Sequence, residues 1–369
     1  MEMILSAFER QLRAQSREGR VPLSCTFELT PTCNLRCHFC YVALDPYKGP
    51  YLTTAEVCAV LDKLEQAGVL WLTLTGGECL SRRDFPEIYR YARRKGLLLT
   101  IFTNATMVTE RHAALFREEP PFSIEVSIYG ADAAHYEGVT GIPGSFARFE
   151  RGVSLLQSAG VALLLKHPTS SLTIDHTAAV REWCTSRNLQ HRFSTTIENR
   201  HGGGQEPSLY RIEPRKVHEL QGELHRIRTG EERTLPLPEC STGGANDGIE
   251  RLYKCGAGRV ALFVDANGRA SHCILDREPS FPLLAMEWDD VWAGMGEWVD
   301  QPLPKDAPCS GCSLRGGCEN CPARSRMATG SPYLKDTYHC DVTHAEYGLE
   351  PAEHPDYRTY PRPLGACAA

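Results

Sequence analysis

Strand-like and helix-like segments alternate between residues 24 and 200, and this alternation limits the possible folds more than any other feature of the sequence. Six segments are predicted as strands, namely CTFELT, LWLTLT, LLLTIFT, FSIEVS, VALLLK and HRFSTTI. Segments with apolar residues at helical spacing lie between them. Strands that alternate with helices pair in parallel, so the sequence predicts an α/β fold. Six such units suit a partial (β/α)6 barrel, because eight would close the full barrel.

The remaining segments differ from this pattern and suggest further units. Residues 1–23 predict one N-terminal helix ahead of the partial barrel at 24–200. Residues 201–250 are rich in glycine and proline and predict a linker with one helix. Residues 251–345 are rich in cysteine and poor in core-forming residues, so we expect a domain stabilised by bound metal. A C-terminal tail is expected at residues 346–369.

Charge and cysteine content narrow the class of protein. A net charge of −6 argues against a nucleic-acid-binding protein, which needs a basic face. The sequence has neither a signal peptide nor an apolar run near the ~20 residues that span a bilayer. We therefore expect a cytoplasmic protein without a membrane partner. Its sixteen cysteines then indicate metal or redox chemistry, because disulfides do not persist there. Cys58 and Cys184 fall in helical patterns and are interpreted as ordinary buried thiols.

Three cysteines, Cys33, Cys37 and Cys40, lie within eight residues directly after the first predicted strand. Thiolates select iron–sulfur clusters, zinc or copper(I). A four-iron cluster normally takes four cysteines, so three would leave one iron open to a small molecule. The C-terminal end of a strand is also where α/β barrels place their active sites. The alternative is a zinc site, with His38 as a possible fourth ligand.

The Cys-x3-Cys-x2-Cys loop, with Phe39 directly before its third cysteine, resembles the signature of radical S-adenosylmethionine (SAM) enzymes. The resemblance implies that Cys33, Cys37 and Cys40 hold a [4Fe–4S] cluster and that SAM chelates its open iron. It also implies that an electron from the cluster cleaves SAM to a 5′-deoxyadenosyl radical. The three cysteines would then be catalytic, and Phe39 would contact the cofactor.

The segment Thr-Gly-Gly-Glu follows the second predicted strand and strengthens this resemblance. Glycine lets the backbone approach a ligand closely, and a carboxylate can accept a hydrogen bond from an ammonium group. In the family this segment holds the methionine amino group of SAM. The resemblance therefore implies that Gly76, Gly77 and Glu78 bind the cofactor. Cys79 stands where many relatives have proline.

Polar residues at the ends of other strands are further candidates for cofactor contacts. Ser127 ends the fourth strand and resembles the position that binds the ribose of SAM. Asn104 ends the third strand, and Lys166, at the end of the fifth, could pair with the methionine carboxylate. Glu198, after the sixth strand, is a weaker candidate. For each of them, the alternative is a polar strand end that only faces water.

The C-terminal cysteines form a second ordered pattern. The segment between Cys255 and Cys273 predicts a β-hairpin with a type I′ turn at Asn267-Gly268, which would bring the two cysteines together. Five more cysteines follow: Cys309, Cys312, Cys318, Cys321 and Cys340. This pattern resembles the SPASM extension of radical SAM enzymes, which holds auxiliary iron–sulfur clusters. Two zinc ribbons are the alternative.

The resemblance implies two auxiliary clusters, both expected to be [4Fe–4S], and hence three clusters in all. The inner cluster would take Cys255, Cys273 and Cys321, and its fourth ligand would be either Cys240 or none, the latter leaving an open iron that could touch the substrate. The outer cluster would be held by the remaining four cysteines, Cys309, Cys312, Cys318 and Cys340.

Relatives with this extension largely modify peptides and proteins, so we expect a cross-link, a thioether or an oxidation in a ribosomally made peptide. Only 23 residues precede the first predicted strand, so a separate leader-binding protein is expected, with flavodoxin or ferredoxin as electron donor. Two alternatives remain open. One is formylglycine formation of the sulfatase-maturase type. The other is a non-catalytic iron–sulfur or zinc protein for electron transfer or regulation, although a pure carrier has no use for an open iron.

Overall fold

The computed structural model describes residues 2–42, 51–233, 235 and 250–349. Its centre is a nine-stranded sheet in the order β6-β5-β4-β3-β2-β1-β7-β8-β9. The first six strands are parallel and follow the sequence order: β1 (Ser24–Glu28), β2 (Trp71–Thr75), β3 (Leu98–Thr103), β4 (Ser123–Ser127), β5 (Leu163–Pro168) and β6 (Gln190–Ser194). The prediction of an α/β fold with a partial (β/α)6 barrel is confirmed.

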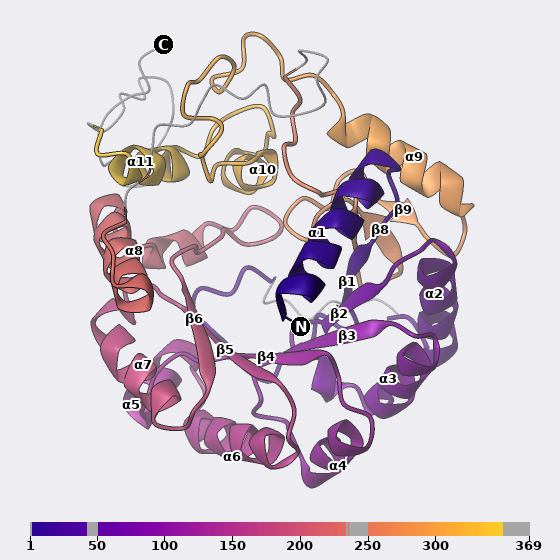
Figure 1. The fold of residues 1–369 in the computed structure, drawn as a ribbon, viewed down its shortest axis with the longest axis vertical. Helices are drawn as coiled ribbons and strands as arrows, with labels where there is room; N and C mark the ends of the chain where they lie inside the picture. The colour runs from indigo at the N-terminus through magenta and orange to yellow at the C-terminus, as the bar shows by residue number, and fades with distance from the viewer. Residues whose placement is uncertain (1, 43–50, 234, 236–249, 350–369) are drawn as a thin grey trace.

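Helices between these strands form an outer arc around the sheet (Figure 1). They are α2 (Thr54–Gln66), α3 (Phe85–Arg94), α4 (Glu110–Glu118), α5 (Ala133–Thr140), α6 (Ser145–Ser158) and α7 (Thr177–Thr185). Thr53 begins α2 with a capping box, in which its hydroxyl and the Glu56 carboxylate each bond the other's backbone N–H. Val57 and Leu61 of α2 pack into the same core as Leu72 and Leu74 of β2. Cys58 and Cys184 lie on α2 and α7, as the helical patterns predicted. Cys184 is buried as expected, but the prediction of a buried thiol is wrong for Cys58, which is partly exposed.

The cysteine-rich half continues the same sheet instead of building a separate one. Strand β7 (Ala261–Val264) pairs in parallel with β1, and β8 (Arg269–Ser271) and β9 (Phe281–Pro282) follow in antiparallel pairs. The predicted hairpin is therefore present, but the type I′ turn is wrong. Gly268 has a φ of +73°, whereas Asn267 is not among the residues with positive φ. The loop is instead a three-residue turn that ends in a left-handed glycine, a common alternative in hairpins.

Five further helices complete the described fold: α1 (Glu2–Glu18), α8 (Pro214–Thr229), α9 (Trp288–Val299), α10 (Pro322–Thr329) and α11 (Thr337–Glu346). Helix α1 crosses the strands in Figure 1, and Arg13 stacks on Trp71 at the start of β2. Helix α8, in the predicted linker, packs Val217 and Leu220 against Tyr338 and Val342 of α11. The barrel and the cysteine-rich half are thus joined by a shared sheet and by a small apolar core. The domain boundaries themselves stay predictions.

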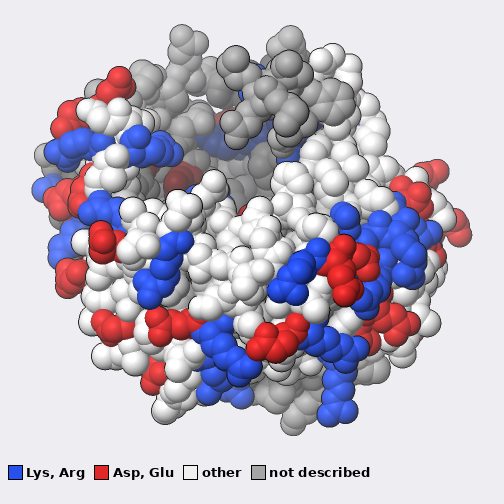
Figure 2. Space-filling view, turned by 60° about the horizontal axis from the view of Figure 1, so that its bottom comes forward, with Lys and Arg blue, Asp and Glu red and all other residues white. Residues whose placement is uncertain are grey.

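Surface charge is mixed on the face that Figure 2 shows, where acidic and basic side chains are interspersed. Arg90 of α3 and Glu119, just after α4, lie 2.9 Å apart and illustrate this pairing. Among the described residues, no helix is both long enough and apolar enough to span a bilayer.

Candidate active site

The inner face of the partial barrel is polar, because successive side chains of a strand point to opposite faces. On β4, Ile124 and Val126 are fully buried in the core shared with the helices, and Glu125 between them is partly exposed. The Lys166 ammonium lies 2.8 Å from the Glu125 carboxylate and 3.3 Å from the centre of the Phe102 ring. Burial lowers the pKa of Lys166, and the bond to Glu125 opposes this shift. Lys166, predicted to pair with SAM, is thus held by Glu125 at this face.

The three-cysteine loop follows β1 and rests on the end of α5. The backbone N–H of Arg36 donates to Thr140 O at 2.9 Å. The pKa of Cys33 is raised to about 11 and that of Cys37 to about 12, mainly by burial and in smaller part by the charges of neighbouring cysteines. Cys40 contributes to both of these shifts, so the three thiols lie close together, as predicted. Because a metal ligand must be deprotonated, cluster binding would release protons here.

Hydrogen-bond donors surround these sulfur atoms. The Leu35 N–H lies 3.4 Å from Cys33 Sγ, and Asn104 Nδ2 lies 3.8 Å from the same atom. The Tyr129 hydroxyl bonds to Cys37, and a backbone N–H bonds to Cys40. Hydrogen bonds to sulfur stabilise thiolate charge and tune the potential of an iron–sulfur cluster. A soft donor set of three thiols with these bonds fits a [4Fe–4S] cluster with one open iron.

Aromatic side chains form a wall beside the loop. Phe39 is buried and meets Tyr129 edge-on at 6.0 Å and Tyr210 at 6.5 Å. The exposed His38 stacks on Tyr210 at 5.7 Å. Tyr129, which also bonds to Ser127, was missed in the sequence. Tyr129 could have been predicted from the sequence, because it lies two residues after Ser127 and strand periodicity places both residues on one face.

The two glycines after β2 bring the backbone against the start of the cysteine loop. The Gly77 N–H donates to Thr30 O at 2.8 Å. A Cβ at Gly76 would lie 2.4 Å from that same oxygen, and one at Gly77 would lie 2.6 Å from the carbonyl oxygens of Pro31 and Thr32. The two glycines thus allow a close approach to the chain itself, and their predicted contact with SAM stays a prediction. The glycines determine where the three-cysteine loop can sit.

Replacing Gly77 by alanine should destabilise the protein by about 1–3 kcal/mol, the usual cost of overpacking, and weaken iron binding at the loop. Both clashing atoms are backbone oxygens, which cannot rotate away. Thermal unfolding and iron content measure the two effects. Gly138→Ala on α5 is the matched control, because its Cβ would meet nothing within 4 Å. Equal behaviour of the two variants would contradict this account of the loop.

Glu78 and Asn104 form a buried support behind Cys33. The Glu78 carboxylate is 1% exposed and accepts hydrogen bonds from Thr103 Oγ1 at 2.8 Å and from the Asn104 N–H at 2.8 Å. Burial raises the pKa of Glu78, and these hydrogen bonds oppose the shift. The Asn104 side chain donates to Asn34 Oδ1 at 3.0 Å, inside the loop. Both predicted residues thus lie at the site and hold its shape.

The C-terminal cysteines gather around a cavity beside α10 and α11. Its lining includes Cys309, Cys312, Cys318, Cys321 and Cys340. Asn320 and Thr343 surround one of these thiols, since the Asn320 N–H and the Thr343 hydroxyl both lie 3.3 Å from Cys318 Sγ. Lys254 lies close enough for the charge of Cys318 to raise its pKa, although burial lowers it more. Thiols with donors and a nearby cation again suit a cluster.

The other predicted set, Cys255, Cys273 and Cys321, is also brought together. The pKa of Cys273 is raised to about 11, mainly by burial and in smaller part by the charges of Cys321 and Cys255. The Leu275 N–H lies 3.4 Å from Cys273 Sγ. Cys321 belongs to this group and also lines the neighbouring cavity. Cys240 lies outside the described residues.

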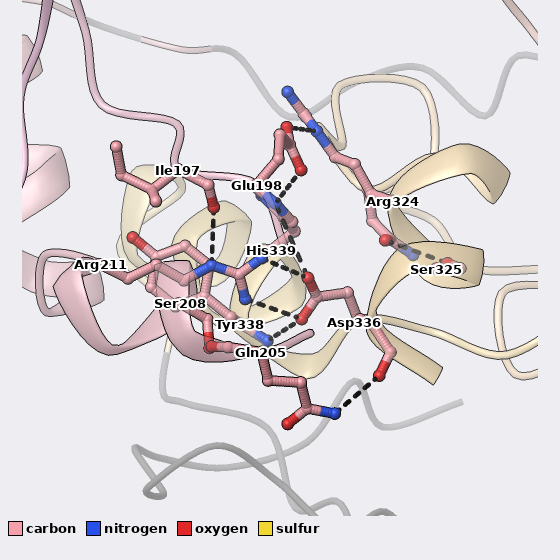
Figure 3. A network of polar contacts seen from close by, with 12 residues as sticks. Ile197, Glu198, Gln205, Ser208, Arg211, Arg324, Ser325, Asp336, Tyr338 and His339 are labelled. Carbon is pink, nitrogen blue, oxygen red and sulfur yellow. Dashed lines mark hydrogen bonds and ion pairs between the residues drawn. The ribbon is translucent and has the colours of Figure 1, made fainter. Parts of the chain in front are cut away.

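A buried polar network connects the barrel to the C-terminal helices (Figure 3). Glu198, in the segment after β6, accepts a hydrogen bond from Arg324 Nε at 2.7 Å. Asp336, at the start of α11, pairs with Arg211 at 3.1 Å, and His339 lies between these pairs. Glu198 was a candidate for the barrel mouth, but in the structure it contacts α10 beside Cys321. The residues of this network lie far apart in the sequence, so sequence patterns did not predict that they are in contact.

Comparison with known proteins gives three results. Residues 27–169 match the radical SAM superfamily. An AdoMet-dependent heme synthase of Nitratidesulfovibrio vulgaris is 34% identical over 137 residues, but this match spans only 37% of either chain. The mycofactocin maturase MftC of Mycobacterium ulcerans is 28% identical over 331 residues and 84% of this chain, or 85% of its own.

The fold also matches a solved structure. Streptococcus suis SuiB bound to S-adenosylmethionine superposes with a TM-score of 0.66 at 16% identity, over 85% of this chain and 76% of SuiB. The superfamily match implies SAM and a [4Fe–4S] cluster as cofactors, and the three-thiol loop lies inside the matched segment. Residues 27–169 therefore form a radical SAM domain.

Proposed function

We propose that this protein is a radical SAM maturase that introduces a cross-link, a thioether or an oxidation into a ribosomally made peptide. The observation that carries the proposal is the three-thiol loop, with Cys37 buried and Cys33 and Cys40 partly exposed, at the C-terminal edge of a polar, partial barrel. The resemblance to mycofactocin maturase MftC over 84% of this chain supports a peptide substrate. SuiB, whose fold is similar, has been crystallised with its precursor peptide SuiA.

In this proposal, Cys33, Cys37 and Cys40 bind the cluster, and SAM bound to its open iron supplies the 5′-deoxyadenosyl radical. Glu78 and Asn104 hold the loop in shape, and Phe39 with Tyr129 shields it on the aromatic side. The remaining cofactor contacts that we propose are those at the strand ends and glycines: Gly76, Gly77, Ser127 and Lys166. Lys166 would have to leave Glu125 to reach a substrate or cofactor carboxylate.

We further propose that the cysteine-rich half is a SPASM domain with two auxiliary [4Fe–4S] clusters. Cys255, Cys273 and Cys321 would bind the inner cluster, with Cys240 as a fourth ligand. The outer cluster would be bound by Cys309, Cys312, Cys318 and Cys340, which line one cavity. Such clusters can accept the electron left on an oxidised substrate. A leader-binding protein and a flavodoxin or ferredoxin complete the proposed system.

The direct test is mass spectrometry of the short peptides encoded beside this gene. Each would be incubated anaerobically with the reconstituted, reduced protein and SAM, with and without a neighbouring leader-binding protein. We expect one peptide to lose hydrogen atoms in proportion to the 5′-deoxyadenosine formed, and no change without SAM. Formylglycine in a sulfatase-derived peptide, or haem formation, would replace the peptide proposal by another radical SAM reaction.

Charges beside Cys321 give a prediction for the inner cluster. The Arg324 backbone N–H bonds to Cys321, and its guanidinium and the Glu198 carboxylate act on this thiol with opposite signs. Arg324→Gln should therefore lower the reduction potential of the cluster, because positive charge favours the reduced form, and Glu198→Gln should raise it. A redox titration followed by electron paramagnetic resonance (EPR) measures both. Shifts of the same sign would indicate structural damage instead of an electrostatic effect.

A further inference from the structure

We propose that Asp132, His135 and His176 form a binding site for a divalent transition metal on the rim of the barrel. Zinc is the metal that we expect there. The three residues come from two separate loops and have no part in the proposed cluster sites. Two imidazoles and one carboxylate are a set that zinc and related metals bind, with the remaining positions left open.

The site lies at the C-terminal edge of the sheet. Asp132 is the N-cap of α5, which follows β4, and His135 lies in the first turn of that helix. His176 ends the short 3-10 helix η2 (Ile174–His176), which follows β5. Strands β4 and β5 are neighbours that end at Ser127 and Pro168. A metal here would therefore join two adjacent loops at the edge of the sheet that also carries the three-cysteine loop.

The ligand atoms already converge. The available ligand atoms of the three side chains all lie within 4.8 Å of one another. His135 Nδ1 lies 2.9 Å from both Asp132 oxygens, and His176 Nε2 lies 3.2 Å from Asp132 Oδ2. Asp132 is fixed from behind, because its Oδ1 accepts the His135 backbone N–H at 3.0 Å. Asp132 is therefore already held in place for a metal, and only the two histidine rings would have to turn.

An ordinary ion pair accounts poorly for the arrangement of the rings. The imidazoles of His135 and His176 stack face to face, with centroids 3.5 Å apart and planes 7° from parallel. Two protonated rings at this distance would repel each other across a single carboxylate. To bind one divalent cation together with the carboxylate, the rings would have to turn out of this stack so that both in-plane lone pairs point at the ion.

A third imidazole, that of His167, lies near His176. His167 is 1% exposed, and its charge interacts with that of His176. Its Nδ1 bonds to Ile128 O at 2.8 Å, and its Nε2 has no hydrogen-bond partner among the described residues. His167 is not among the three proposed ligands.

The test uses the protein with its iron–sulfur clusters reconstituted, so that cluster cysteines are occupied, after removal of loose metal by a chelator. Zinc is titrated calorimetrically under anaerobic conditions, and X-ray absorption at the zinc edge then identifies its ligands. We expect one saturable site with nitrogen and oxygen ligands at about 2.0–2.1 Å. His176→Ala and Asp132→Asn should each weaken zinc binding by about tenfold or more.

The matched control is His225→Ala on α8, which should bind zinc like the wild type. Asp132→Asn could weaken the start of α5, so His176→Ala, outside that helix, carries the conclusion, with circular dichroism to verify folding. Absence of a saturable site, equal binding by His176→Ala, or sulfur ligands at about 2.3 Å would each overturn the proposal. None of these outcomes depends on SAM cleavage, so the result is independent of the proposed reaction.

Discussion

Replacing Cys33 by alanine should abolish SAM cleavage and remove about four of about twelve irons, because a four-iron cluster held by three thiols cannot lose one without losing its anchor. The contacts of Cys33 with described residues supply hydrogen-bond donors and no replacement ligand. Cys33 receives hydrogen bonds from Leu35 N and Asn104 Nδ2, and the buried Glu78 fixes the backbone of Asn104. In the variant, the space left by the Cys33 sulfur atom would therefore be lined by hydrogen-bond donors, which do not bind iron. Iron and sulfide analysis and 5′-deoxyadenosine release measure the effect.

Cys58→Ala is the control for this prediction. Cys58 is a partly exposed thiol on α2, away from both groups of clustered cysteines, and its loss should change neither iron content nor SAM cleavage. Circular dichroism would show that both variants keep the α/β fold. Retention of all irons in the Cys33→Ala variant would contradict the assignment of this loop as a cluster site.

Replacing Arg211 by alanine should lower the free energy of unfolding by about 3–5 kcal/mol, the usual cost of leaving one buried charge without its partner. Arg211 and Asp336 are 2% and 6% exposed as side chains, and their charged atoms lie 3.1 Å apart. The guanidinium also donates to Ile197 O at 2.9 Å and lies over the Tyr338 ring. Asp336 caps α11, which carries Cys340. Loss of this pair should therefore also loosen the outer cluster.

Two further variants separate charge from packing. Arg226→Ala removes an exposed pair with Glu232 on α8, which should cost at most about 1 kcal/mol. The double variant Arg211→Met with Asp336→Asn removes both buried charges, keeps a capping side chain and should be more stable than Arg211→Met alone. Urea unfolding and iron retention measure these differences. A loss for Arg211→Ala as small as that for Arg226→Ala would show that the pair does not hold the two halves together.

Local patterns were sufficient to predict the barrel. The runs LWLTLT and LLLTIFT combine β-branched and aliphatic residues, and each is followed by a helical pattern, so parallel βα units are the natural interpretation. The three-cysteine loop could be predicted equally well, because its three cysteines lie within eight residues of sequence. Gly76 and Gly77 were predicted to allow close approach, and they do so against residues 30–32.

Contacts between distant segments could not be predicted in this way. The cysteine-rich half was expected to form a separate unit, yet β7 pairs with β1 across more than 200 residues of sequence. Nothing local to Lys166 indicates Glu125 as its partner, and nothing local to Glu198 indicates Arg324. Such pairs depend on which loops the folded sheet brings together. Periodicity alone could have identified Tyr129, whose position two residues after Ser127 places it at the site.

The central claim is that the three-cysteine loop holds a cluster with an iron open to SAM. The most direct measurement is the EPR spectrum of the reduced, reconstituted protein with and without SAM, compared with the Cys33→Ala, Cys37→Ala, Cys40→Ala triple variant. The account predicts a wild-type signal that shifts when SAM is added and is absent from the triple variant, whose auxiliary signals remain. Zinc in place of iron, or a spectrum that SAM leaves unchanged, would contradict it.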